Sequence, residues 1–237
     1  AGASIDALTF SDGSTWTVSD IEAHLTNELT SGADIYVGTE GNDDIDGQEG
    51  DDNLIGVAGD DVLVGGVGRD VLVGGDGSDT LDGRGDGAPD LMQGDADGDV
   101  YLFGRGSGAD VVEDSGDVLS NDVIRLDSGI SPSDILLQIS GNDLVLKIVG
   151  TSDQITIVDG AISTKIERIE FADATVWSEA DIRQQIINGA ATGSDDVIVG
   201  FDGNELIRGL DGNDTLNGLA GDDVLIGGSG VDSLSGD

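Results

Sequence analysis

A nine-residue period anchored on glycine constrains the fold of this chain more than any other feature. From Gly38, glycine recurs at every ninth position, and the blocks read GTEGNDDID, GQEGDDNLI, GVAGDDVLV, GGVGRDVLV and GGDGSDTLD without a break. Each block has Gly at its first and fourth places, Asp at its sixth and a large apolar residue at its eighth. Self-similarity of this kind predicts a solenoid, in which each repeat buries its apolar side against its neighbours.

The same pattern returns in the second half of the chain. From Gly200 the blocks read GFDGNELIR, GLDGNDTLN, GLAGDDVLI and GGSGVDSLS, and a degenerate block with Asp196 precedes them. A looser block with Asp34 likewise precedes the first array. Residues 83–93 break the period, because this block is eleven residues long and contains a proline. We predict a protruding turn and a frame shift of two residues there, with the frame recovered around Asp99.

A segment of different character lies between the arrays, from about residue 115 to 190. Its apolar runs predict β-strands at 122–126, 135–139, 144–149, 155–158 and 166–171. Ser178 and Asp181 form a capping-box pattern ahead of Ile182 and Ile186, which are at helical spacing. A short helix is therefore expected to close the segment.

A longer repeat contains the nine-residue one. Residues 5–16, IDALTFSDGSTW, align with residues 166–177, IERIEFADATVW, at an offset of 161, and Asp34 aligns with Asp196 at an offset of 162. A second capping pattern, at residues 19–22, predicts that a helix follows here too. We therefore expect about one and a half units of a longer tandem protein. Its regions would be the tail of a β module (1–30), a first array (31–114), a β-rich module (115–190) and a second array cut in mid-block (191–237).

The nonapeptide blocks resemble the GGxGxDxUx repeat of the RTX, or haemolysin-type calcium-binding, family over roughly half of the chain. Residues 115–190, with IERIEFADATVW at 166–177, resemble the β-rich module that accompanies such arrays in large haemolysin-type proteins. The resemblance implies an all-β fold, in which two parallel β-roll solenoids flank a small β-rich module closed by a short helix. It also implies that calcium is the ligand, held mainly by the sixth-place acids and by backbone carbonyls of the turn glycines.

Elementary chemistry explains how such blocks would fold. Glycine at the first and fourth places lets the backbone adopt positive φ in a tight turn, and the β-branched residues that follow can extend as a short strand. Two blocks would then make one 18-residue coil, with the eighth-place residues in a narrow core and Tyr101 in the core after the irregular block. Stacked turns would bring together acids two blocks apart, such as Asp43 with Asp61 or Asp52 with Asp70.

The chemistry of these acids indicates which ion they bind. Hard oxygen ligands without His or Cys select calcium over zinc or copper, and a flexible shell favours calcium over magnesium. Without the ion, each close pair of carboxylates would cost about 1–4 kcal/mol. We therefore expect calcium binding and folding to be one reaction.

The predicted calcium ligands are the sixth-place acids, the turn glycines and two acids of irregular turns. They are Asp34, Gly38, Gly41, Asp43, Gly47, Gly50, Asp52, Gly56, Gly59, Asp61, Gly65, Gly66, Gly68, Asp70, Gly74, Gly75, Gly77, Asp79, Asp90, Asp99, Asp196, Gly203, Glu205, Gly209, Gly212, Asp214, Gly218, Gly221, Asp223, Gly227, Gly228, Gly230 and Asp232. Counting the pairs of acids two blocks apart predicts about 6–9 calcium ions, all of them in the arrays and none in the β module. Glu205 replaces aspartate, so its site would have a longer arm.

The composition excludes several classes of partner and of chemistry. The chain has 49 acidic and 9 basic residues, a formal charge of −40, which excludes nucleic acid and anionic membranes as electrostatic partners. Without cysteine it has no disulfides, zinc–thiolate sites or thiol catalysis. The GxSxG, HExxH and Walker patterns do not occur, and the one histidine, His24, aligns with Gln185 on a predicted helix. We therefore expect a protein that is not an enzyme.

The sequence and the family resemblance together predict the location and the route of export of the protein. Residues 1–20 contain no Sec signal peptide, and the chain has no apolar run long enough to span a membrane. The resemblance implies export by type I secretion machinery, through a signal outside this chain, to a secreted or cell-surface location. Arg84–Gly85–Asp86 spells an integrin-type tripeptide, but chance accounts for it in a chain so rich in Gly and Asp.

Two interpretations of function follow. The first is a calcium-binding RTX β-roll segment of a larger secreted protein, which folds on calcium binding outside the cell. The second is a structural spacer of a long surface adhesin, filament or S-layer-like protein, in which neighbouring tandem units repeat and calcium stiffens them. The first is the leading interpretation, and the repeat of about 162 residues is the support for the second.

Overall fold

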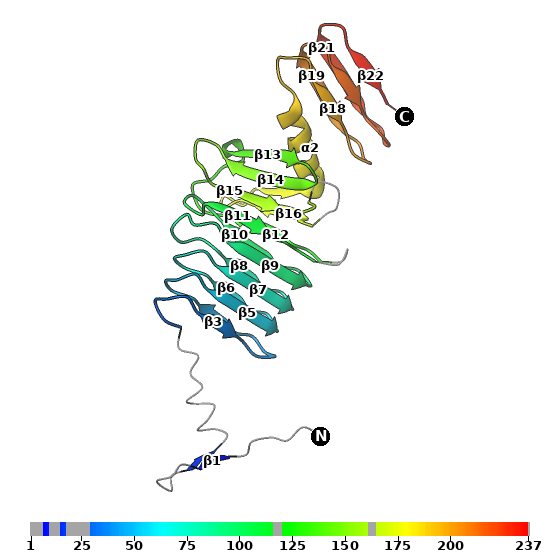
Figure 1. Ribbon diagram of the computed structural model, residues 1–237. Coiled ribbons are helices and arrows are strands. Elements are labelled where there is room, and N and C mark those ends of the chain that lie inside the picture. The colour runs from blue at the N-terminus through cyan, green and yellow to red at the C-terminus, as the bar shows by residue number, and fades with distance from the viewer. Residues whose placement is uncertain (1–6, 10–14, 18–28, 116–119, 161–164, 237) are drawn as a thin grey trace.

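The computed structural model describes residues 7–9, 15–17, 29–115, 120–160 and 165–236. Most of these residues form a β-solenoid, in which the strands of two sheets stack coil upon coil (Figure 1). A shorter stack of strands follows toward the C-terminus. The all-β class and the parallel β-roll are thus as predicted.

Two sheets build the main solenoid. In spatial order, one contains β17 (Val176–Ser178), β16 (Arg168–Glu170), β12 (Val123–Leu126), β10 (Val100–Phe103), β8 (Thr80–Asp82), β6 (Val62–Val64) and β4 (Asp44–Asp46). The other contains β13 (Ile135–Ser140), β14 (Asp143–Ile148), β15 (Gln154–Ile157), β11 (Ala109–Val112), β9 (Leu91–Ala96), β7 (Val71–Asp76), β5 (Asn53–Ala58) and β3 (Ile35–Val37). A short 3₁₀ turn, Pro132–Asp134, precedes β13.

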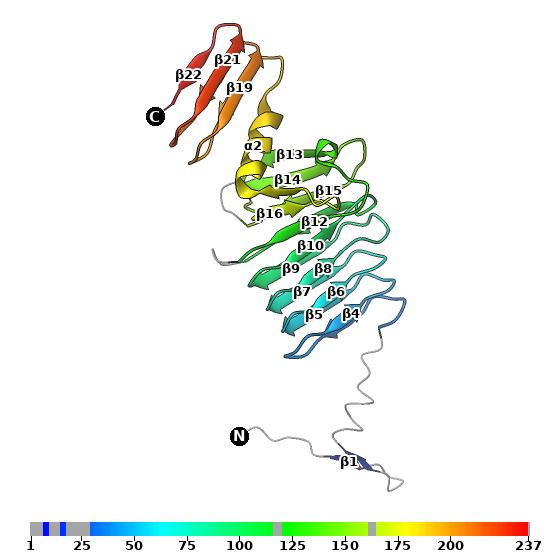
Figure 2. The ribbon, with the colours of Figure 1, turned by 180° about the vertical axis from the view of Figure 1, so that it is seen from behind.

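The C-terminal stack also has two sheets. One contains β18 (Val197–Val199), β20 (Thr215–Asn217) and β22 (Ser233–Ser235), and the other contains β19 (Leu206–Asp211) and β21 (Val224–Ser229). The helix α2 (Glu179–Ala190) lies between this stack and the main solenoid, as both views show (Figure 1, Figure 2).

The register between neighbouring strands measures the length of one coil. Leu54 of β5 lies opposite Leu72 of β7, so one coil has 18 residues, which is two blocks. Leu72 in turn lies opposite Met92 of β9, an offset of 20 residues. The predicted frame shift of two residues is therefore confirmed, and residues 85–87 of the irregular block are exposed in a bend.

The eighth-place residues form the core, as the repeat predicts. Because successive side chains of a strand point to opposite faces, a strand of three residues buries one side chain per block. The buried side chains at these places in the main solenoid are Ile45, Leu54, Leu63, Leu72, Leu81, Met92, Tyr101, Val112 and Ile124. A core this narrow is filled mainly by aliphatic side chains, in agreement with the low aromatic content of 3%.

The β-rich module continues the solenoid without a break in either sheet. Strand β12 pairs in parallel with β10, and β16 pairs in parallel with β12. In the other sheet β15 pairs in parallel with β11, and the antiparallel pairs β14–β15 and β13–β14 extend it. One hydrophobic core runs from Ile45 through to Ile182. The change in sequence character at about residue 115 therefore reflects a change in the length of the connections between strands. The first array and the module share both sheets and one hydrophobic core.

Helix α2 begins at the predicted capping box and serves both parts of the molecule. The Ser178 N–H donates to Asp181 Oδ2 at 2.9 Å, and the Asp181 N–H donates to Ser178 Oγ at 3.3 Å. Ile182 packs in the core of the main solenoid, whereas Ile187 packs with Ile198 in the core of the C-terminal stack. The helix therefore joins two separate cores.

The longer repeat is visible in the strand registers. Leu8 of β1 (Ala7–Thr9) lies opposite Trp16 of β2 (Thr15–Thr17), and Ile169 lies opposite Trp177, so both pairs match at an offset of 161. Tyr36 likewise lies opposite Leu54, and its counterpart Ile198 lies opposite Leu216, at an offset of 162. The helix predicted after residue 19 and His24 lie outside the described residues.

Candidate calcium sites

The sixth-place acids form ladders of hydrogen bonds, two in the main solenoid and two in the C-terminal stack. The Asp43 N–H donates to Asp61 Oδ1 at 2.7 Å, and the Asp61 N–H donates to Asp79 Oδ1 at 2.8 Å. The same bond joins the other successive acids, namely Asp34–Asp52, Asp52–Asp70, Asp70–Asp90, Asp79–Asp99, Asp90–Asp110, Asp99–Asp122, Asp196–Asp214, Glu205–Asp223 and Asp214–Asp232. The structure thus brings the predicted pairs together, through a carboxylate that accepts a backbone N–H of the preceding coil.

The second oxygen of these carboxylates accepts no hydrogen bond although it is buried. This holds for Oδ2 of Asp52, Asp61, Asp70, Asp79, Asp99, Asp110, Asp214 and Asp223. A buried acceptor without a partner costs about 1–3 kcal/mol, and more when it is charged, so a regular row of them needs an explanation such as a bound ion.

The first-place glycines leave open the space that these oxygens face. A Cβ added to Gly47 would lie 2.5 Å from Asp52 Oδ2 and 2.5 Å from the carbonyl oxygen of Gly65, one coil further on. A Cβ on Gly38 would lie 2.7 Å from Asp43 Oδ2 and 2.6 Å from the carbonyl oxygen of Gly56. Beside each such glycine, a carboxylate oxygen and a carbonyl oxygen of adjacent coils therefore face one point, where any side chain would collide.

This geometry corrects the predicted role of the first-place glycine. None of the first-place glycines has positive φ, whereas the fourth-place residues Gly50 and Gly59 do, at 131° and 109°. In most blocks the second place also has positive φ, even where it carries a side chain, as at Gln48 (73°) and Val57 (93°). The first place needs glycine because two oxygens occupy the position of its Cβ, and the turn itself is made by the second and fourth places.

Burial and crowding make the carboxylates resist ionisation without a cation. Burial, and then the charge of Asp61, raise the pKa of Asp79 from 3.8 to about 6. Burial, and then the charge of the preceding acid of the ladder, likewise raise the pKa of Asp90 to about 7 and the pKa values of Asp99 and Asp110 to about 8. In the described residues, the ion pairs of arginine use other acids, such as Asp82, Asp134 and Glu170. No protein cation of the described part therefore neutralises the ladders by direct pairing.

The first acid of each ladder has a different environment. Thr39 and Thr30 donate their N–H groups to Oδ2 of Asp43 and Asp34, at 2.6 and 2.7 Å. Thr192 does the same for Asp196 at 2.6 Å, and Glu205 Oε2 accepts from the Phe201 N–H at 3.2 Å. In these outer turns the local backbone supplies the partner that the inner acids lack.

Two acids of the ladders were not predicted. Asp110 accepts from the Asp90 N–H, and Asp122 accepts from the Asp99 N–H. Asp110 belongs to a block without a first-place glycine, but its second and fourth places, Gly106 and Gly108, have positive φ. The stretch Gly-x-Gly-x-Asp-x-Val would have identified Asp110, and the likeness of Asn-Asp-Val-Ile at 121–124 to Asp-Asp-Val-Leu at 60–63 would have identified Asp122.

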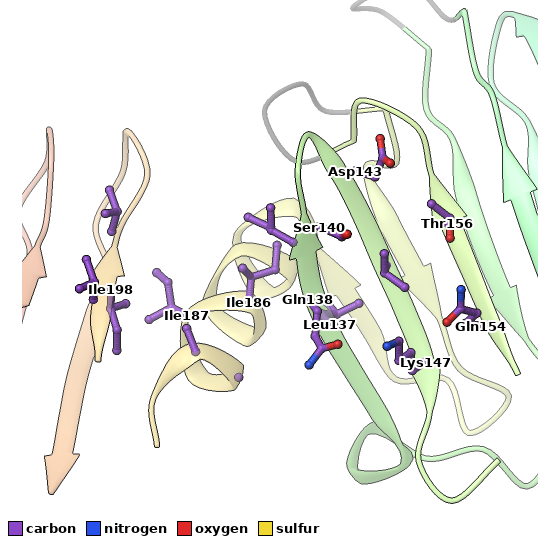
Figure 3. A pocket seen from close by; sticks show the side chains of 16 residues that line it. Leu137, Gln138, Ser140, Asp143, Lys147, Gln154, Thr156, Ile186, Ile187 and Ile198 are labelled. Atoms are coloured by element: carbon purple, nitrogen blue, oxygen red, sulfur yellow. The ribbon is translucent and has the colours of Figure 1, made fainter. Parts of the chain in front are cut away.

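Two further features lie away from the ladders. The Arg84 guanidinium of the integrin-type tripeptide is engaged by Asp82 and Asp127 within the protein. A cleft of about 700 Å³ lies between the β13–β15 face, α2 and β18, and Figure 3 shows Leu137, Ile187 and Ile198 on its apolar sides. Asp143 at its rim accepts from the Asp159 N–H at 3.0 Å, so this carboxylate holds a turn.

The fold is a parallel β-roll lined by carboxylate ladders, and comparison with known families identifies its repeats as calcium-binding ones. The RTX calcium-binding nonapeptide repeat matches four times, at residues 29–63, 55–87, 190–216 and 199–234. The haemolysin-type calcium binding protein related domain matches residues 143–181. No curated protein matches the chain. Since the matches together span more than half of the sequence, the chain belongs to the RTX, haemolysin-type calcium-binding, repeat family.

The repeat family and the β-roll architecture both indicate a structural, ion-binding protein. A β-roll of RTX repeats is typically structural and ion-binding. In the described part of the chain, no helix combines the length and the apolar character needed to cross a membrane.

Proposed function

We propose that this chain is a calcium-dependent folding segment of a larger secreted protein. On this proposal residues 31–114 and 191–237 are arrays that take up calcium, 115–190 is the module between them, and 1–30 is the tail of another module. The observation that carries the proposal is the row of buried carboxylate oxygens without partners, most of which face the space beside a first-place glycine.

The donor set supports calcium as the ion. Beside Gly38, Gly47, Gly56 and Gly209 the space is lined by a carboxylate oxygen and by a carbonyl oxygen of the next coil, and hard cations prefer such ligands. Sixth-place acids such as Asp61 and Asp214 would hold the ion, together with turn carbonyls such as that of Gly74. The ion would supply positive charge to a ladder that has none of its own.

The energetics favour coupling of folding to calcium. Without the ion, folding buries oxygens that keep no partner and crowds acids in a chain of formal charge −40. Each buried oxygen left unpaired costs about 1–3 kcal/mol, which several coils multiply beyond the stability of an ordinary domain. In calcium-poor cytosol the chain would stay unfolded, as passage through a type I secretion channel requires, and it would fold outside the cell.

Chelation tests this proposal directly. Far-UV circular dichroism of the whole chain should show β-structure in millimolar calcium and coil in EDTA, with recovery when calcium is restored. Magnesium at the same concentration serves as the control and should restore little, because it demands a rigid octahedral shell. Native spectra in EDTA would refute coupled folding.

A structural spacer is the second candidate, and the longer repeat favours it. The β1–β2 and β16–β17 pairs have the same register, and so do the first strand pairs of the two arrays. Units that repeat in register could build a long surface protein stiffened by calcium. The coding sequence on either side of this segment discriminates: many further units would indicate a spacer, and a separate catalytic or lytic domain would indicate an accessory module.

A further inference from the structure

Three buried carboxylates converge where the first array meets the β-rich module. Asp99, Asp114 and Asp122 each place a carboxylate oxygen within 4.8 Å of the others. Their side chains come from different segments, and the three residues are 0%, 3% and 1% exposed. Asp114 is neither a sixth-place acid nor a turn glycine, so the nonapeptide pattern does not account for this group.

Asp114 stands where the regular coils have a first-place glycine. Met92 lies opposite Val112, and two positions further along the same register Asp114 lies opposite Gly94. In a regular coil the residue opposite the first-place glycine is another glycine, which contributes only its carbonyl oxygen. Here the carbonyl of Asp114 accepts from the Lys165 ammonium, and the side chain brings a carboxylate to the site instead.

Independent observations indicate that the cluster is built to receive a ligand. Asp99 Oδ2 is buried and accepts no hydrogen bond. The buried Tyr101 hydroxyl donates to Asp114 Oδ2 at 3.1 Å and accepts from the Gly94 N–H at 3.0 Å, so the Asp114 carboxylate is held in place. The Asp99 N–H donates to Asp122 Oδ1 at 2.8 Å, which positions the Asp122 carboxylate.

The negative charge of the cluster favours a bound cation. Three carboxylates meet in a buried space, and the Lys165 ammonium donates to the main-chain carbonyl of Asp114. Calcium affinity rises with the number of carboxylate ligands and with the rigidity of the site. This site has one carboxylate more than the pairs of the regular coils, and that additional carboxylate, Asp114, is held by the buried Tyr101.

We propose that Asp99, Asp114 and Asp122 form a calcium site that differs from the nonapeptide sites, binds the ion most tightly, and joins the first array to the module. The inference deepens the proposed function and rests on it for the identity of the ion. It also departs from the expectation that the module supplies no ligand, because Asp122 belongs to the module.

Calcium titration of the full chain and of two variants tests the site. By calorimetry, wild type should show one site that binds calcium at least about tenfold more tightly than the others. Removing even a group that only orients a metal ligand weakens metal binding by about 10- to 100-fold, so an additional direct ligand should have at least this effect. Asp114→Asn keeps the shape and should abolish the tight site. Glu113→Gln removes the same charge from an exposed neighbour and should preserve it.

Terbium luminescence adds a readout that depends on position. Terbium replaces calcium at oxygen sites, and Tyr101 lies within hydrogen-bond distance of Asp114, so the first equivalent should give strong emission on tyrosine excitation. Tyr101→Phe and Asp114→Asn should both remove this early emission, while Tyr36→Phe should not. Asp114→Asn is then expected to fold in calcium, at a higher concentration than wild type.

The outcomes separate this inference from the proposed function. If Asp114→Asn binds calcium and terbium like wild type while EDTA still unfolds the chain, the site is refuted and coupled folding stands. If wild type binds no calcium, both are refuted. The inference is supported if the tight site is lost in Asp114→Asn and kept in Glu113→Gln, and if the early terbium emission is lost in both Asp114→Asn and Tyr101→Phe.

Discussion

Two blocks of nearly identical sequence occupy very different environments in this protein. GVAGDDVLV at 56–64 and GLAGDDVLI at 218–226 differ only at their second and ninth places. In the first array Asp61 is 1% exposed and Leu63 is fully buried, whereas Asp223 and Leu225 in the second array are only partly buried. The difference therefore arises from the neighbours of each block.

Stacking on both sides explains the contrast. Strand β6, which follows Asp61, pairs with β4 on one side and with β8 on the other, in a seven-stranded sheet that the module extends. The second array has only two or three strands in each sheet, and β22, with Leu234 at 48% exposed, is an edge strand. In a solenoid, stability is a sum of block and interface contributions, so the same block binds and folds differently with one neighbour or two.

The largest expected effect comes from removing one charge in the middle of the first array. Asp61→Asn should raise the calcium concentration at the folding midpoint by about 10- to 100-fold or more, because Asp61 faces two successive sites. The matched variant Asp223→Asn should change it much less. Hydrogen exchange followed by mass spectrometry can report each array separately. Equal shifts in both variants would mean that stacking does not decide affinity.

Removing a core side chain should separate stability from metal binding. Leu63→Ala should lower the free energy of unfolding by about 2–5 kcal/mol in saturating calcium, because it empties a fully buried position. Leu225→Ala should cost less than this range, since its side chain is only partly buried. Urea denaturation with hydrogen exchange as the probe measures both. Loss of bound calcium at saturation in Leu63→Ala would contradict the separation.

A smaller effect is expected from pH in the absence of calcium. Burial raises the pKa of Asp79 to about 6 and that of Asp99 to about 8, from 3.8, so the folded first array binds more protons than the unfolded chain. In EDTA the free energy of unfolding should therefore be highest below about pH 4 and fall as the pH rises toward 8.

Calcium should reverse this pH dependence, because a carboxylate must lose its proton to bind the ion. Circular dichroism across this pH range, with and without calcium, gives the comparison. Acidification in EDTA that restores no β-structure would show that carboxylate charge is not what prevents folding of the metal-free chain.

The period predicted the parts of this structure that depend on local repetition. Coil length, the buried eighth places and the frame shift at residues 83–93 follow from spacing alone. The conformation of the first-place glycine was predicted wrongly. Glycine occurs both where a side chain would collide and where the backbone needs positive φ, and the sequence alone does not distinguish the two cases.

The junction with the module could not be predicted from spacing. The Asp122 N–H donates to Glu167 at an offset of 45 residues, so the ladder continues across an insertion that has no nonapeptide period. Asp114 joins Asp99 only because β9 and β11 set the register between them. Such contacts depend on strand pairing over long separations, which a repeat pattern does not encode.

The central claim is that calcium fills the spaces beside the first-place glycines, and counting the bound ions tests it most directly. Native mass spectrometry of the whole chain, after saturation with calcium and removal of the excess, gives the number of ions per chain. Stacked turns predict about 6–9 ions, with a lower count in Asp61→Asn. Two or fewer ions per folded chain would contradict the account.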